Sequence, residues 1–173
     1  AVSDNRASRQ NARMRRQQCL MVLGMHRSGT SALTRLLSLL GAELPKTLMP
    51  AANGNERGHW ESQAIANFND RLLEAAGTSW DDWSPLNPRL PDSPIWPVYV
   101  DEARELVLSE FGKAPIFVFK DPRLCRLASF WREAIAAAKV DLKIVLPIRS
   151  PIEVAQSLAA RDAIDEDYGM LLW

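Results

Sequence analysis

Two glycines bracket a short loop, GMHRSGTS at 24–31, which follows an apolar run and precedes a segment with helical spacing. We call residues 24–31 the Gly loop. The backbone amides of such a loop and of the helix after it point at one spot and bind phosphate. The spacing matches a P-loop, but Thr30 and Ser31 stand where a nucleotide-hydrolysing P-loop has Lys and then Ser or Thr. The loop carries its cation inside, at Arg27. The pattern therefore predicts an anion site that differs from an ATPase site.

Cations also follow two later apolar runs of the sequence. Lys120 and Arg123 come directly after the first of these runs, and Arg149 comes directly after the second. The carboxyl ends of parallel strands meet at one edge of a sheet, and ligands bind there. Three cationic strand ends beside a Gly loop therefore predict a site for a ligand with several negative groups. Asp121 is expected to pair with Arg123 and brace this turn.

Hydrophobic patterning predicts the elements that position these residues. Three short apolar runs predict buried strands at Cys19–Leu23, Ile116–Phe119 and Leu142–Ile148. Each run precedes a segment with helical periodicity, which is typical of parallel strands joined by crossover helices. The predicted fold class is α/β, a P-loop-like parallel sheet with three visible strands flanked by helices.

Five helices are expected, at about 30–40, 62–76, 94–112 and 125–139, and from 151 onward. Gly77 is expected to end the second helix, and Ser93-Pro94 to begin the third. Ser150 and Glu153 have the spacing of a capping box for the fifth helix.

Two long connections, 45–59 and 78–94, are rich in Pro, Gly and Asn. Connections of this length in a compact domain are usually functional. Three tryptophans lie in them or beside them, at Trp60, Trp80 and Trp83. We therefore expect ordered loops that line a cleft, with the tryptophans either packed or open to sugar stacking.

The composition of the chain is that of an ordinary globular protein. A single domain is predicted to span residues 19–173. Residues 1–18 hold five arginines and one aspartate and are predicted to be a mobile basic tail. The net charge is zero and no apolar run is long enough for a membrane span, so neither nucleic acid nor a membrane span is expected. Cys19 and Cys125 are expected to be free, buried thiols, which favours a reducing, cytoplasmic location. His and Cys form no cluster, so no metal site is expected.

Three segments of the chain resemble sulfotransferases that use 3′-phosphoadenosine 5′-phosphosulfate (PAPS). They are GMHRSGTSALTRLL at 24–37, FKDPRL at 119–124 and PIRSPIEVAQSL at 147–158. The middle segment is similar to the K-D-P segment of protein-tyrosine sulfotransferases. The resemblance covers about residues 19–160 and rests on the three segments occurring in this order at successive strand ends. It implies a 5′-phosphosulfate loop in the first segment and a 3′-phosphate site in the third.

The resemblance implies donor-binding roles for Arg27, Ser28, Gly29, Thr30, Ser31, Arg149 and Ser157. The first five would bind the 5′-phosphate and the sulfonate, and the last two would bind the 3′-phosphate. Arg27 and Lys120 would neutralise charge that spreads over the transferred group and the leaving oxygen. The implied reaction moves a sulfonate group by in-line displacement to a hydroxyl acceptor, a carbohydrate or another small molecule, without a metal.

The acceptor hydroxyl needs a general base, and the segment 55–61 holds the candidates. Glu61 is the first choice, because the dipole of the helix predicted to start there favours an ionised carboxylate. A structural role as a first-turn acid stays open for Glu61. His59 is the second choice. His26, inside the Gly loop, is expected to be a wall residue or a backbone partner.

Members of the resembled family continue with further helices, another strand and a loop that closes over the nucleotide. Nothing up to Trp173 matches that part, so we expect a truncated form whose fold is incomplete at its C-terminus. Two other functions stay open. One is a P-loop kinase or NTPase, with Asp121 on magnesium, and the other is a non-catalytic nucleotide-binding module. The acceptor's identity and the oligomeric state stay open as well.

Overall fold

A computed structural model describes residues 16–51 and 58–173 of the chain. Most of the predicted basic tail, residues 1–15, lies outside the described residues, and so do residues 55–57 of the segment expected to hold the base. The side chain of Gln17 donates to the carbonyl oxygens of Gly112 and Ala114 at 2.9 and 2.8 Å. The chain is thus bonded to the domain just before its first strand.

Three parallel strands form a sheet in the order β2-β1-β3. They are β1 (Gln18–Val22), β2 (Ile116–Lys120) and β3 (Asp141–Val145). In the register of the sheet, Val22 pairs with Lys120 on one side and with Val145 on the other. The three strands therefore end at one level, and the predicted α/β class with a parallel sheet is confirmed.

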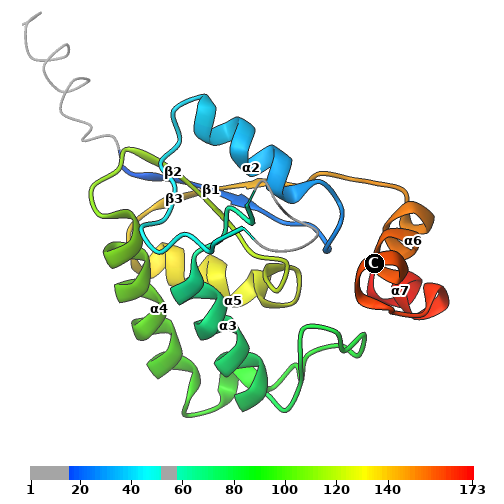
Figure 1. Cartoon of the computed structure of the whole chain (residues 1–173). Helices are drawn as coiled ribbons and strands as arrows, with labels where there is room; N and C mark the ends of the chain where they lie inside the picture. The colour runs from blue at the N-terminus through cyan, green and yellow to red at the C-terminus, as the bar shows by residue number, and fades with distance from the viewer. Residues whose placement is uncertain (1–15, 52–57) are drawn as a thin grey trace, which may run out of the picture.

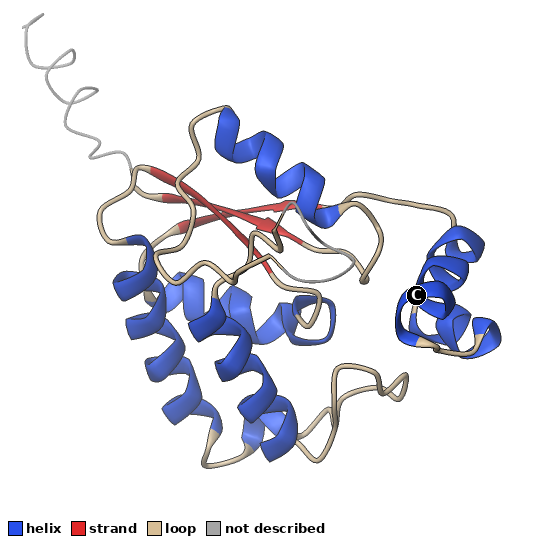
Figure 2. Ribbon diagram, in the orientation of Figure 1, coloured by secondary structure: helices blue, strands red, loops and turns tan. Residues whose placement is uncertain are grey.

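Helices cover both faces of this sheet, as Figures 1 and 2 show. The helices of the described residues are α2 (Thr30–Leu39), α3 (Gln63–Ala75), α4 (Trp96–Phe111), α5 (Leu124–Ala137), α6 (Pro151–Asp162), α7 (Glu166–Leu172) and a 3-10 helix (Leu90–Asp92). Helix α2 lies on one face, and α3, α4 and α5 lie on the other. Helices α6 and α7 pack on each other beside the sheet.

The core is built around apolar side chains on both faces of β1 and β2. Phe117 and Phe119 of β2 face the layer of α3, α4 and α5, whereas Val118 faces α2. Trp131 is fully buried in the larger cluster, and its indole nitrogen donates to Asn69 Oδ1 at 2.8 Å. Burial on both faces explains why these strands are continuous apolar runs rather than alternating ones.

Helix α3 has the boundaries that the sequence predicts. The hydroxyl of Ser62 caps it by accepting a hydrogen bond from the amide of Ile65 at 3.0 Å. Gly77 follows its last turn with a φ of 74°, a left-handed conformation that suits glycine. The predicted extent of this helix and its stop at Gly77 are confirmed, and the cap by Ser62 is an addition to the prediction.

Strand β3 ends at Val145, so its predicted extension to Ile148 is wrong. Val145 pairs with the last residue of β1, and its carbonyl oxygen accepts from Leu23 N at 3.0 Å. Two residues later, Pro147 has no amide with which to continue a ladder. The side chain of Ile148 is 78% exposed. The apolar run is therefore longer than the strand that it predicts. The prediction of a buried strand is wrong here as well, because β3 lies at one edge of the three-stranded sheet and Ile144 is 54% exposed.

Helices α4 and α6 begin in ways that differ from the sequence prediction. Helix α4 starts at Trp96, later than predicted, because the hydroxyl of Ser93 donates to Leu90 O at 2.6 Å and closes the 3-10 helix. The capping box predicted for α6 is wrong. Its acid, Glu153, accepts instead from Arg149 Nε at 3.0 Å.

Both cysteines are free thiols, but only one of them is buried as predicted. Cys19 lies in the core, whereas Cys125 is exposed. Cys125 stands in the first turn of α5, whose inward positions are taken by Leu124 and Leu127. No helix in the described part of the chain is long and apolar enough to span a membrane.

Candidate functional site

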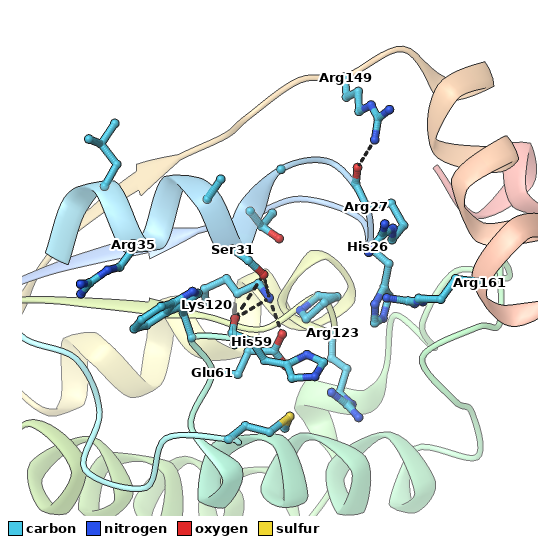
Figure 3. Close-up of a pocket in the computed structure, with 18 of the residues that line it drawn as sticks. His26, Arg27, Ser31, Arg35, His59, Glu61, Lys120, Arg123, Arg149 and Arg161 are labelled. Carbon is cyan, nitrogen blue, oxygen red and sulfur yellow. Dashed lines mark hydrogen bonds and ion pairs between the residues drawn. The ribbon is translucent and has the colours of Figure 1, made fainter. Parts of the chain in front are cut away.

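A cavity of about 1140 Å³ opens between the Gly loop, the start of α2 and the turn after β2 (Figure 3). Its charged lining consists of Arg27, Arg35, Lys120, Arg123, Arg149 and Arg161, with Glu61 and Asp162 as the acids. The excess of positive charge suits a ligand with several negative groups. The volume suits a nucleotide-sized ligand.

The conformation of the Gly loop depends on close packing and on two left-handed residues. A Cβ on Gly24 would lie 2.6 Å from Thr30 Cγ2, so the loop folds back on the start of α2 only with glycine there. Gly29 has a φ of 84° and Arg27 has a φ of 68°. Such a conformation is strained for Arg27, a residue with a side chain, and strain of this kind is common at functional sites. Helix α2 begins at Thr30, and its first amides have no acceptor within the helix.

Arg27 is held between two residues that come from the far end of the chain. Its Nε donates to Ser157 Oγ at 2.8 Å, and its carbonyl oxygen accepts from Arg149 Nη1 at 2.9 Å. The residues predicted to bind the 3′-phosphate therefore converge on the Gly loop. Ser157 reaches the site through Arg27, and Arg149 lines the cavity itself.

Lys120 connects the end of β2 to the Gly loop. Its ammonium donates to Ser31 Oγ and to the carbonyl oxygen of His59, both at 3.2 Å, and it forms an ion pair with Glu61 (Figure 3). The Lys120 and Glu61 side chains are only 3% and 7% exposed. The structure thus brings together three of the residues predicted for catalysis and fixes an ammonium group at the start of α2.

The group that favours the ionised form of Glu61 is Lys120, and not the helix dipole expected from the sequence. It precedes the cap of α3, Ser62, so it is not a first-turn acid of that helix. Burial raises the pKa of Glu61 above its ordinary value, and the positive charge of Lys120 opposes part of this rise. A carboxylate with a raised pKa accepts a proton more readily than a solvated one.

His59 lies beside this ion pair and is half-buried. Burial lowers the pKa of its imidazole, and the charges of Lys120 and Arg161 lower it further. The ring is therefore neutral near neutral pH and could accept a proton. The structure places both predicted base candidates on the cavity wall.

Asp121 and Arg123 brace the turn after β2, and this predicted pairing is confirmed. Asp121 Oδ1 accepts from the backbone amide of Arg123 at 2.8 Å and from its Nη1 at 3.2 Å. A second carboxylate, that of Asp70 on α3, accepts from Arg123 Nη2 at 2.9 Å. Both acids are thereby engaged in holding the guanidinium of Arg123 at the cavity edge.

His26 is a wall residue of the cavity, as expected. Its ring lies 4.6 Å from that of Trp80. Burial, with help from the nearby charge of Arg161, lowers the pKa of His26 to about 3, so the ring is neutral. Of the three loop tryptophans, Trp60 also lines the cavity, while Trp83 is 58% exposed.

The sequence analysis missed three charged residues of the lining. Arg35 stands one helical turn after Ser31 on α2, so helical spacing could have identified it. Arg161 and Asp162 come from the end of α6. No local pattern marks these last two, because only the packing of α6 beside the Gly loop brings them to the cavity.

In the ranges 16–51 and 58–173, no three His, Cys, Asp or Glu side chains gather so that they could hold a metal ion. No family model, curated protein or solved structure matches the chain.

Proposed function

We propose that this chain has a P-loop-like fold and acts as a PAPS-dependent sulfotransferase with a hydroxyl acceptor. The contact between Lys120 and Ser31 carries the proposal, because it puts an ammonium group beside the Gly loop. In a nucleotide-hydrolysing P-loop that charge comes from the loop itself. Here it comes from the neighbouring strand end, with Arg27 as the cation inside the loop.

The residues present fit a donor with a 5′-phosphosulfate and a 3′-phosphate. The tight packing at Gly24 folds the loop back on the start of α2, and the first amides of α2 would hold the 5′-phosphate with Arg27. Arg149, which is exposed at the other side of the loop, would hold the 3′-phosphate. When bound, PAPS would supply an activated sulfonate for an in-line displacement.

Within this proposal, the chain's own residues have distinct tasks. Lys120 holds positive charge where negative charge develops on the transferred group. Glu61 accepts the proton of the acceptor hydroxyl, and His59 is the second candidate for that task. The proposed compartment is the cytoplasm, because both cysteines are free thiols.

The competing kinase or NTPase function would use Asp121 to hold magnesium. The carboxylate of Asp121 is buried and accepts hydrogen bonds from Arg123. This engagement supports the sulfotransferase proposal over a magnesium-dependent one. Turnover separates the proposal from a non-catalytic nucleotide-binding module.

Calorimetric titration tests the proposed donor. We expect 3′-phosphoadenosine 5′-phosphate to bind more tightly than AMP, and EDTA to leave its affinity unchanged. Tighter binding of ATP with magnesium, abolished by EDTA, would instead support a kinase or NTPase. If the chain binds the nucleotide but transfers no sulfonate from PAPS to a hydroxyl compound, the result would support a non-catalytic nucleotide-binding module.

The first prediction concerns Arg27. Replacing Arg27 with Ala removes a charge-assisted contact of about 1.5–3 kcal/mol, so affinity for 3′-phosphoadenosine 5′-phosphate should fall about tenfold or more. Calorimetry measures the loss. Arg132→Ala, on the exposed side of α5, is the matched control and should bind like the wild type. Unchanged affinity in a folded Arg27→Ala protein would remove the Gly loop from the nucleotide site.

The second prediction concerns Arg149 and Ser157. The double alanine variant should lose the preference for the 3′-phosphorylated nucleotide over AMP. The single variants separate the two roles, because Ser157 contacts Arg27. If Ser157 orients Arg27, Ser157→Ala should weaken the binding of both nucleotides. If Ser157 binds the 3′-phosphate, the substitution should weaken the binding of the 3′-phosphorylated nucleotide alone. Survival of the preference in the double variant would show that other residues recognise the phosphate.

A further inference from the structure

One end of the cavity is built by a single face of α2. Ser31, Arg35 and Leu39 follow one another at a spacing of four residues and all line the cavity. Residues at this spacing lie on one side of a helix, about 6 Å apart along its axis. Figure 3 shows Arg35 on one side of Lys120 and Ser31, with Arg27 and Arg149 on the other. The cavity thus extends along α2, away from the proposed donor site.

Arg35 differs from the other cations of the cavity in its partners. Ion pairs join Lys120 to Glu61, Arg123 to Asp70 and Asp121, Arg149 to Glu153, and Arg161 to Asp162. Arg27 donates to Ser157. In the part of the chain that the structure describes, Arg35 has no carboxylate partner and no hydrogen bond, only a ring beneath it. None of the carboxylates in the described ranges therefore neutralises its positive charge.

That ring is the indole of Trp60, whose centroid lies 4.7 Å from Arg35 Cζ. Stacking on an aromatic face positions a guanidinium and leaves its N–H edge available for an anion. Trp60 has a φ of 59°, which is unusual for a bulky residue. The backbone at Trp60 is thus held in the conformation that puts its ring beneath Arg35.

The same end of the cavity has an apolar wall. Leu36 and Leu39 of α2 line it while remaining 52% and 66% exposed, and Met49 lines it from the connection after α2. Exposed apolar side chains that line a cavity gain free energy when an apolar group covers them. A bare cation next to exposed leucines suits a ligand that is anionic and apolar at once.

We propose that this end of the cavity is the acceptor subsite and takes an amphipathic hydroxy acid. The acid's anionic group binds Arg35, its apolar body covers Leu36 and Leu39, and its hydroxyl lies at Lys120. The subsite rests on the proposed function, because sulfonate transfer is what gives the hydroxyl its role. The acceptor is thus a small anionic molecule with an apolar part.

The test compares 3-(4-hydroxyphenyl)propionate with its neutral amide as probes of the whole chain. Calorimetry is expected to show the carboxylate binding about tenfold tighter than the amide, since it gains a charge-assisted hydrogen bond. Arg35→Gln should abolish this difference and leave the affinity for the amide unchanged. Arg132→Gln makes the same change of charge on the exposed side of α5 and should keep the difference. Circular dichroism checks that both variants fold.

Three results would overturn the inference: no binding of the carboxylate to the wild type, equal binding of carboxylate and amide, or a preference that survives Arg35→Gln. Titration with 3′-phosphoadenosine 5′-phosphate separates this inference from the donor assignment. Arg35→Gln should bind that nucleotide like the wild type. A loss of affinity for the nucleotide would assign Arg35 to the donor site and overturn the acceptor subsite. If the nucleotide does not bind but the acid preference depends on Arg35, the anion site at Arg35 stands, whereas the sulfotransferase proposal and the acceptor role of this site fail.

Discussion

Replacing Lys120 with Ala is expected to lower turnover of PAPS by about a hundredfold or more, and to lower the free energy of unfolding by about 3–5 kcal/mol. The first effect follows from removing the ammonium group beside Ser31. The second follows because Glu61, only 7% exposed, loses its cation and stays behind as a buried, unpaired charge. Denaturant titration measures the stability, and an assay of sulfonate transfer from PAPS to a hydroxyl compound measures the turnover.

The loss of stability in this variant should depend on pH. The charge of Lys120 lowers the pKa of Glu61 against the rise that burial causes, so removing Lys120 raises that pKa further. A carboxyl whose pKa is higher in the folded than in the unfolded protein favours folding at low pH, and this benefit is lost as pH rises through the folded pKa. The cost of Lys120→Ala should therefore be largest at neutral pH and shrink as the pH falls toward the ordinary pKa of a glutamate.

Two further variants isolate the ion pair. Lys113→Ala removes an exposed lysine and should change the free energy of unfolding by no more than about 0.5 kcal/mol. Adding Glu61→Gln to Lys120→Ala should restore much of the lost stability, because the buried charge is gone, yet should not restore turnover. A Lys120→Ala protein as stable as Lys113→Ala at pH 7.5 would contradict the buried pair.

The fold was predictable where one local signal acts alone. β1 and β2 are buried on both faces, so their continuous apolar runs identify them. The third apolar run identifies β3 as a strand although β3 is largely exposed. Helix α3 begins after Ser62 and ends before Gly77, as expected. The prediction failed where a competing partner stood nearby. Glu153 matches a capping box in spacing, but the guanidinium of Arg149, four residues earlier, takes its carboxylate.

The candidate site was predictable only where backbone topology alone determines it. Lys120 ends a strand, and parallel strands bring their ends together, so its closeness to the Gly loop follows from the fold class. The contact of Arg27 with Ser157 spans 130 residues and depends on how α6 packs beside the loop. Arg35 is an intermediate case. Its spacing from the Gly loop was visible, but its stacking on Trp60 is a property of the folded cavity.

The proton acceptor is the remaining choice in the proposed chemistry, and both candidates are close to the ammonium of Lys120. The carboxylate of Glu61 forms an ion pair with that ammonium. His59 accepts a hydrogen bond from the ammonium through its backbone carbonyl oxygen, and not through its imidazole. Burial raises the pKa of Glu61 and lowers that of His59. Near neutral pH, therefore, the imidazole is neutral and can accept a proton, and the raised pKa of Glu61 makes its carboxylate a better proton acceptor than a solvated one.

Glu61→Gln is expected to lower turnover by about a hundredfold or more and to change the affinity for 3′-phosphoadenosine 5′-phosphate by less than about twofold. Glutamine keeps an oxygen for Lys120 but cannot take up the acceptor's proton. The wild-type rate should fall as pH drops through the raised pKa of Glu61, because the protonated carboxyl no longer accepts a proton. This acid limb should vanish in Glu61→Gln and persist in the matched variant His59→Asn. Wild-type turnover by Glu61→Gln, with the limb lost in His59→Asn, would assign the base to His59.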